Sequence, residues 1–184
     1  MPSTRPRIAF NSTGICNACG YKKKSNKTNF KQREATLKKL LKTCKSKNSK
    51  YDCIVPWSGG KDSSYVAYQL KFKYGANPLL VTFSPLIPSE IGKHNRNELV
   101  KLGFDHILVS PNKKISSYLS KRFLIERGNP KVAWDAGINS APFKTALEKK
   151  IKLIFYAEHG ESEYGGRVLN KDSDKIRNFE EVIE

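Results

Sequence analysis

The sequence has no long apolar run and contains only four cysteines among its 184 residues. A membrane-spanning helix needs about 20 apolar residues in succession, and residues 1–7 lack the apolar segment of a secretory signal. Four cysteines are also too few for the disulfide frameworks of small secreted domains. We therefore expect a soluble, cytoplasmic protein with no membrane partner.

Acidic residues are almost absent from the first 50 positions. This stretch holds 14 of the 34 lysines and arginines and only one acidic residue, Glu34, whereas residues 51–184 hold 20 basic and 16 acidic residues. Such a basic segment binds nucleic acid, anionic lipid headgroups or an acidic partner, or it simply forms a solvated surface. The change in composition predicts a basic N-terminal segment at 1–50 and a separate domain at 51–184.

Short apolar runs alternate with amphipathic segments over much of the chain. This alternation predicts an α/β fold, in which helices cover both faces of a parallel sheet, with a small cysteine-containing segment at residues 1–25. Strands are predicted at 51–56, 78–83, 105–109 and 151–156; helices are predicted at 29–46, 62–74, 93–103, 112–127 and 140–150, with a loop at 128–139.

A serine- and glycine-rich loop follows the first predicted strand. Glycines let backbone N–H groups approach an anion, and the N-terminus of the next helix supplies further donors. Lysine adds a positive charge, serines add hydroxyls, and the aspartate either caps the helix or helps to hold a phosphate-bound Mg²⁺. The loop therefore predicts a site for the phosphates of ATP. Its residues are Ser58, Gly59, Gly60, Lys61, Asp62, Ser63 and Ser64.

The hexapeptide 58–63 resembles the SGGxDS signature of the ATP-pyrophosphatase (PP-loop) superfamily. Its length and order differ from the GxxxxGK[ST] and GxGxxG loops. The resemblance implies an enzyme that cleaves ATP between its α- and β-phosphates, forms an adenylate and then admits a nitrogen or sulfur nucleophile. It also implies a sheet of at least five strands. We count four, so we expect a chain that is incomplete at its C-terminal end.

A wider resemblance, over residues 2–166, is to N-acetyl sugar amidotransferases of surface-polysaccharide and flagellar-sugar synthesis. The matching stretches are 2–8, 14–19, 51–64, 78–83 and 163–166. The resemblance implies that ATP adenylates the amide oxygen of an N-acetylated, nucleotide-linked sugar, and that ammonia then displaces AMP to leave an amidine. It also implies a separate glutaminase subunit as the ammonia source. Lys61 and Asp62 would then be catalytic.

The acidic and cysteine residues outside the loop give further candidates. Glu158, Glu161 and Glu163 follow the last predicted strand, where they either position Mg²⁺ and polarise the nucleophile or form a solvated acidic loop. Glu163 is favoured as a catalytic residue because it belongs to the family-like stretch 163–166. Cys16 and Cys19 have the spacing of half a tetrahedral zinc site, and we expect Zn²⁺ as a possible third cofactor.

Two other functions stay open at this point. A tRNA-thiolating PP-loop enzyme would explain the basic segment through phosphate contacts. However, such enzymes carry further cysteines near the active site, and no cysteine follows Cys53. The other alternative is a non-catalytic nucleotide-binding remnant. Substrate could bind in the predicted loop 128–139, which contains Trp134.

Overall fold

The computed structural model describes residues 2–4, 8–25, 28–45 and 49–158. One compact unit consists of residues 37–157, and residues 1–36 belong to a second. Each unit is described here by itself. The division predicted at residue 50 stays a prediction. No helix in the described ranges is long and apolar enough to cross a membrane.

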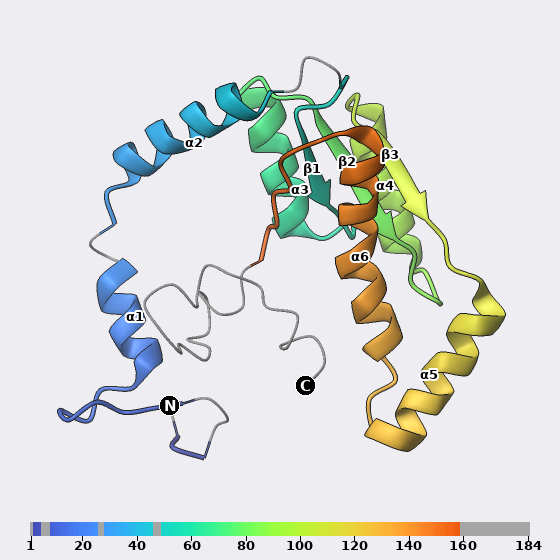
Figure 1. The fold of residues 1–184 in the computed structure, drawn as a ribbon, viewed down its shortest axis with the longest axis horizontal. Helices are drawn as coiled ribbons and strands as arrows, with labels where there is room; N and C mark the ends of the chain where they lie inside the picture. Colours follow the sequence, from blue (N-terminus) through green and yellow to red (C-terminus); the bar gives the residue numbers. More distant parts are fainter. Residues whose placement is uncertain (1, 5–7, 26–27, 46–48, 159–184) are drawn as a thin grey trace. The chain divides into compact units, whose positions relative to one another are not determined.

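The larger unit is built on a three-stranded parallel sheet in the order β1-β2-β3 (Figure 1). In the register of the sheet, Cys53 of β1 lies beside Pro78 of β2, and Leu79 of β2 lies beside Asp105 of β3. The strands match the prediction closely, because each contains an apolar run. β1 and β2 are almost wholly buried, whereas β3 is exposed at Asp105 and Leu108. Their bounds are β1 Cys53–Pro56, β2 Pro78–Phe83 and β3 Asp105–Val109.

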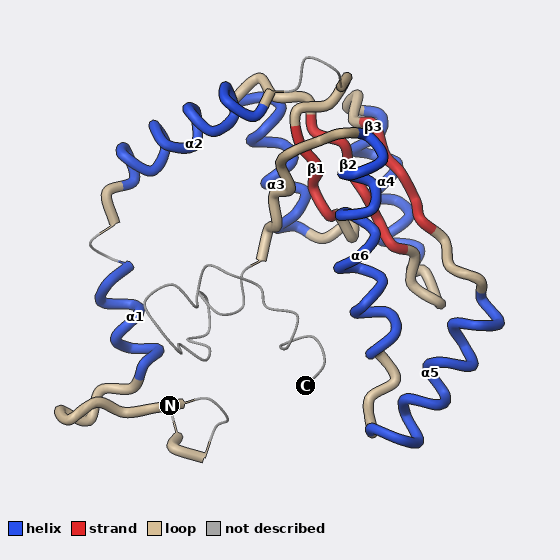
Figure 2. The backbone as a smooth tube through the Cα atoms, in the orientation of Figure 1, coloured by secondary structure: helices blue, strands red, loops and turns tan. Residues whose placement is uncertain are grey.

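Helices precede, connect and follow the strands. α1 and α2 come before the sheet, and the remaining helices lie between or after its strands (Figure 2). Their bounds are α1 Asn17–Ser25, α2 Phe30–Cys44, α3 Lys61–Tyr68, η1 Gln69–Lys73, α4 Glu90–Lys101, α5 Lys113–Arg127 and α6 Val132–Lys149.

Alternate residues of the strands point into two separate apolar clusters, one on each face of the sheet. Cys53, Val55 and Leu80 pack with residues of α3, η1 and α4. Ile54 and Leu79 pack on the opposite face with residues of α6. Period-two alternation within buried strands therefore places helices on both faces, which confirms the predicted α/β architecture.

The helix after β1 ends in a π-helical segment. α3 passes directly into η1, where the N–H of Tyr74 donates to the carbonyl of Gln69, five residues earlier. Gly75, at φ +64°, then ends the helix, as the sequence predicts. The π segment was not predicted, because a single extra residue in a turn leaves no mark in an apolar pattern.

The predicted loop 128–139 is wrong over most of its length, because α6 begins at Val132 and runs through it. Gly137 and Pro142 suggest a break in sequence, since both are unfavourable inside helices. Both are buried in the structure. Small side chains bring this face of α6 against β2, where the ring of Phe83 packs directly on Gly137. Packing therefore overrides local preference.

The predicted fourth strand, 151–156, is also wrong in its extent. The segment does run beside β1 and parallel to it, but it forms only one bridge, between Ile54 and Ile154. Two backbone hydrogen bonds make that bridge, from Ile54 N to Leu153 O (2.9 Å) and from Phe155 N to Ile54 O (2.8 Å). β1 is thus flanked on both sides.

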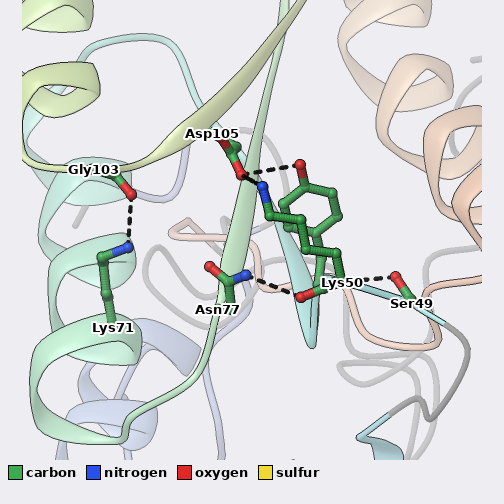
Figure 3. Close-up of polar contacts among 7 residues, drawn as sticks. Ser49, Lys50, Lys71, Asn77, Gly103 and Asp105 are labelled. Atoms are coloured by element: carbon green, nitrogen blue, oxygen red, sulfur yellow. Dashed lines mark hydrogen bonds and ion pairs between the residues drawn. The ribbon is translucent and has the colours of Figure 1, made fainter.

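Polar contacts tie the amino ends of the strands together (Figure 3). Asp105 accepts hydrogen bonds from Lys50 Nζ (2.7 Å) and from the hydroxyl of Tyr51 (3.0 Å). These two donors, with Lys50 first, lower the pKa of Asp105. Asn77 Nδ2 donates to the Lys50 carbonyl at 2.9 Å. Residues that precede β1 and β2 and the first residue of β3 are therefore joined at this edge.

Candidate nucleotide-binding site

The loop at residues 58–60 lies at the carboxyl end of β1 and leads directly into α3. Parallel α/β sheets bind ligands at this edge. Gly59 has φ +87°, which a residue with a side chain adopts only with strain. Gly60 occupies the N-cap of α3 and has no side chain to accept a hydrogen bond from the first turn. The helix N-terminus therefore keeps donors for an anion.

Three polar side chains of the loop lie at its surface. Ser58, Lys61 and Asp62 are exposed, and the side chain of Lys61 retains 89% of its accessible surface. Lys61 Nζ lies 2.9 Å from both carboxylate oxygens of Asp62. Lysine and aspartate therefore sit side by side at the opening of the loop. Such a pair can hold a phosphate and its accompanying cation together.

The serine hydroxyls of the loop form hydrogen bonds within it. Ser58 Oγ accepts from the N–H of Gly60 at 3.3 Å. Ser64 Oγ donates to the Gly60 carbonyl at 2.7 Å, and Ser63 Oγ lies 3.4 Å from the same oxygen. In this structure these hydroxyls brace the loop, and Ser63 is buried. The expectation that Ser58, Ser63 and Ser64 donate to phosphate stays a prediction.

Trp57 forms the buried floor under the loop. Its N–H donates to Val81 O (2.8 Å), and its indole Nε1–H donates to Ser64 Oγ (2.8 Å). Thr82 Oγ1 donates to the backbone carbonyl of Trp57. Because a hydroxyl has one hydrogen, Thr82 must accept the 2.8 Å hydrogen bond that it shares with His106 Nε2. This bond fixes the proton of His106 on Nε2. Burial, and then the charge of Arg96, lowers the pKa of His106.

Two residues of α4 complete the loop, and sequence reasoning missed both. Asn95 Nδ2 donates to the Gly59 carbonyl at 2.8 Å. A Cβ added at Gly59 would lie 3.2 Å from the carbonyl oxygen of Gly92. Ser89 caps α4 by accepting from the N–H of Gly92 at 3.1 Å. No local pattern links these residues to the loop, because they meet it only after β2 has formed.

A second feature at the same edge is a pocket of about 200 Å³. The indole Nε1–H of Trp134 is buried, and no described residue accepts a hydrogen bond from it. None of the described residues that line the pocket is charged. The lining residues are Phe83, Ser84, Leu86, Pro111, Asn112, Ile115, Ser116, Leu119, Ser120, Ala133 and Trp134. They end or follow β2, follow β3, or belong to the first half of α5 and the start of α6, so the pocket lies at the carboxyl ends of those strands.

The cysteine pair does not form a metal site on its own. Among the described residues, no three His, Cys, Asp or Glu side chains come together to hold a metal ion. The N–H of Cys19 lies 3.5 Å from Cys16 Sγ and, with the Cys19 thiol, lowers the pKa of Cys16. Two thiols do not fit a closed zinc site, which needs four ligands. The expected zinc is therefore unsupported by the described residues.

Two of the acidic candidates fall outside what the structure describes. Glu161 and Glu163 belong to residues 159–184, so the predicted catalytic role of Glu163 lies outside the described residues. Glu158 is described, and its side chain is exposed. Cys53 lies at the amino end of β1, and burial raises the pKa of its thiol to about 12. It lies at the edge opposite the loop.

No family model matches the chain. Over 53 residues it is 40% identical to an uncharacterized protein of Methanocaldococcus jannaschii, a match that covers 29% of this chain and 19% of that protein. A solved structure from the same organism, described as a predicted subunit of tRNA methyltransferase, has 27% identity and a TM-score of 0.38 over 65% of this chain and 58% of that one. The chain thus spans less than two thirds of either protein.

Proposed function

We propose that the chain binds ATP at loop 58–64 and adenylates a substrate, with release of pyrophosphate. The observation that carries this proposal is the geometry of the loop at the end of β1. A glycine in the left-handed conformation, an N-cap without a side chain and the exposed Lys61 together form a cradle for phosphate oxygens. Its donors would stabilise the negative charge that grows on the departing pyrophosphate.

The residues have distinct roles in this proposal. Backbone N–H groups at the start of α3 bind the phosphates, and Lys61 neutralises their charge. Asp62 would hold the magnesium ion that accompanies ATP, because Mg²⁺ takes few protein ligands and otherwise binds water and phosphate oxygens. When bound, that ion supplies further neutralisation of the phosphates. The Lys61–Asp62 ion pair would open to receive both groups.

The reaction that we propose is the conversion of the acetamido group of an N-acetyl sugar into an amidine. The amide oxygen attacks the α-phosphorus of ATP, and the bond from that phosphorus to the pyrophosphate oxygen breaks. Ammonia then adds to the activated carbon, which releases a proton from nitrogen. The carbon–oxygen bond breaks last, and AMP leaves with the electron pair. A separate glutaminase subunit would supply the ammonia.

The neutral pocket at Trp134 is where we place the acetylated sugar. An acetamido sugar is uncharged at its ring and carries a carbonyl acceptor, which suits the buried indole N–H. The apolar face of a sugar packs against an aromatic ring, and Phe83 and Trp134 line this pocket. Ser116 and Ser120 offer hydroxyls to the hydroxyl groups of the ring. The pocket and the loop share the carboxyl edge of the sheet.

Pyrophosphate release from Mg-ATP, measured with candidate nucleotide-linked N-acetyl sugars and an ammonium salt, tests this function. Lys61→Ala and Asp62→Ala should abolish release without unfolding the domain, because both side chains are at least half exposed. Lys121→Ala, an exposed lysine of α5, is the matched control and should retain full turnover. Unchanged turnover in both loop variants contradicts the assignment of the loop. Release that requires tRNA and a sulfur donor would favour the tRNA-thiolating alternative.

A further inference from the structure

A second cavity lies at the amino edge of the sheet, away from the loop at residues 58–64. Its volume is about 320 Å³. Asp52 directly precedes β1, and Gly75 and Ala76 precede β2, so these residues mark the amino ends of both strands. The complete lining is Lys38, Leu41, Lys42, Lys45, Asp52, Lys73, Tyr74, Gly75 and Ala76.

Four lysines line this cavity, and two of them share one side of α2. Lys38 and Lys42 are four residues apart, which places them on one helical face, and Lys45 directly follows the end of the helix at Cys44. Leu41 lies on the same face as Lys38 and Lys42 and packs against the apolar cluster of the sheet. The packing of Leu41 therefore turns these two lysines toward the amino edge. Lys73, the last residue of η1, brings the fourth amino group from another element.

The charge of the cavity is strongly positive. Among the lining residues that the structure describes, Asp52 is the only acidic one. Both oxygens of that carboxylate already have partners. Oδ2 accepts a hydrogen bond from the N–H of Asn77 at 2.9 Å, and Oδ1 lies 4.0 Å from Lys45 Nζ. Tyr74 contributes an aromatic ring, with Lys73 Nζ 5.1 Å from its centroid. Flexible lysine ammonium groups bind phosphates, and an aromatic ring beside them can stack on a base, so this combination suits a nucleic acid.

We infer that this cavity binds the phosphate backbone of a single nucleic-acid strand. Three or four lysine contacts around a hollow fit successive phosphates better than one small anion, and the ring of Tyr74 offers a surface for a base. The site is distinct from the nucleotide loop. β1, with four residues, separates the two edges by about 13 Å at 3.3 Å per residue. The inference therefore goes beyond the proposed adenylation and does not depend on it.

Salt-dependent binding of a fluorescein-labelled oligouridylate, followed by fluorescence anisotropy, tests the inference on the full chain. The triple variant K38E/K42E/K45E should weaken binding about a hundredfold and reduce the slope of log Kobs against log [KCl] by about two, since each single-strand phosphate contact contributes about 0.7. The control K113E/K114E/K121E makes the same change of net charge on exposed positions of α5. It should lower affinity much less.

Several outcomes would overturn the inference. The first is equal weakening of binding in the two charge-reversal variants, which would show that binding depends only on the net charge of the protein. Another is an absence of oligonucleotide binding by the wild type. A third is binding of orthophosphate or pyrophosphate, measured by calorimetry, with the same lysine dependence and no strand binding. Should K38E/K42E/K45E fail to fold by circular dichroism, K38Q/K42Q/K45Q supplies the comparison. Mg-ATP affinity should be unchanged in the lysine variants, which keeps this test separate from that of the loop.

Discussion

The indole N–H of Trp57 donates a 2.8 Å hydrogen bond to the hydroxyl of Ser64. Trp57 directly precedes loop 58–64 and Ser64 is its last residue, so this bond joins the two ends of the loop. The same hydroxyl of Ser64 donates a 2.7 Å hydrogen bond to the Gly60 carbonyl. One serine therefore anchors both the buried floor and the N-cap of α3.

Ser64→Ala should destabilise the protein and weaken nucleotide binding. The substitution leaves the indole N–H of Trp57, in a side chain that is 3% exposed, without its acceptor. We expect the free energy of unfolding in urea to fall by about 1–3 kcal/mol, and the affinity for Mg-ATP in calorimetry to fall with it. Ser117→Ala, at an exposed position of α5, serves as the control. Equal stability of the two variants would contradict the role of this bond.

Gly59→Ala tests how closely the loop and α4 approach each other. Alanine at φ +87° is strained by about 1–2 kcal/mol, and its Cβ would also lie 3.2 Å from the Gly92 carbonyl oxygen. Gly128→Ala is a matched control, because Gly128 has φ +67° and nothing within 4 Å of an added Cβ. We expect the larger loss of stability in thermal unfolding for Gly59→Ala. Equal losses would show that crowding by α4 is unimportant.

The half-buried ring of His106 should make stability depend on pH. Burial lowers its pKa in the folded state, whereas in the unfolded chain the ring titrates near about 6.5. Above that pH both states are neutral. Below it the unfolded state gains a proton first, so the free energy of unfolding falls until the folded state is protonated as well.

Urea unfolding of the wild type and His106→Gln across this pH range measures the effect. The variant should lose part of the decline below about pH 6.5, since glutamine keeps a donor for Thr82 but does not titrate. His94→Gln is the control, and it should keep the decline. Identical pH profiles for wild type and His106→Gln would contradict the buried neutral imidazole.

Cysteine reactivity should distinguish the buried Cys53 from the exposed Cys19. Cys53 is fully buried and its pKa is raised to about 12, so almost no thiolate exists at neutral pH. Cys19 is exposed. Iodoacetamide at about pH 8 should therefore modify Cys19 and leave Cys53 intact in the native protein, as read by peptide mass spectrometry. In urea both should react. Rapid native modification of Cys53 would show that β1 opens.

The sheet and the loop were predictable because their signals are local. Apolar runs predict β1, β2 and β3, and the first two of these strands are almost wholly buried. Gly59 and Gly60 sit where a strand meets a helix, so the position of the glycine-rich turn follows from spacing. Helix ends at Gly75, Gly103 and Gly128 also follow from local chemistry, because glycine adopts the positive φ that ends a helix.

The remaining features depend on contacts between distant parts of the chain. Gly137 and Pro142 look like helix breakers until the surface of β2 is there to receive them. Asn95 reaches the loop only through the placement of α4. The lysine cavity needs α2 and η1 to meet at the start of β1. Such relations carry no signal at a fixed spacing, so reasoning from periodicity misses them.

The π segment Gln69–Lys73 gives this helix one place where its length can change safely. A π turn holds more residues than an α turn, so deleting the exposed Phe72 would restore ordinary winding while both ends stay in place. A deletion inside α3 would instead rotate every later residue of the helix by about 100°. Natural variants that differ by one residue between the loop and β2 should therefore carry that difference here.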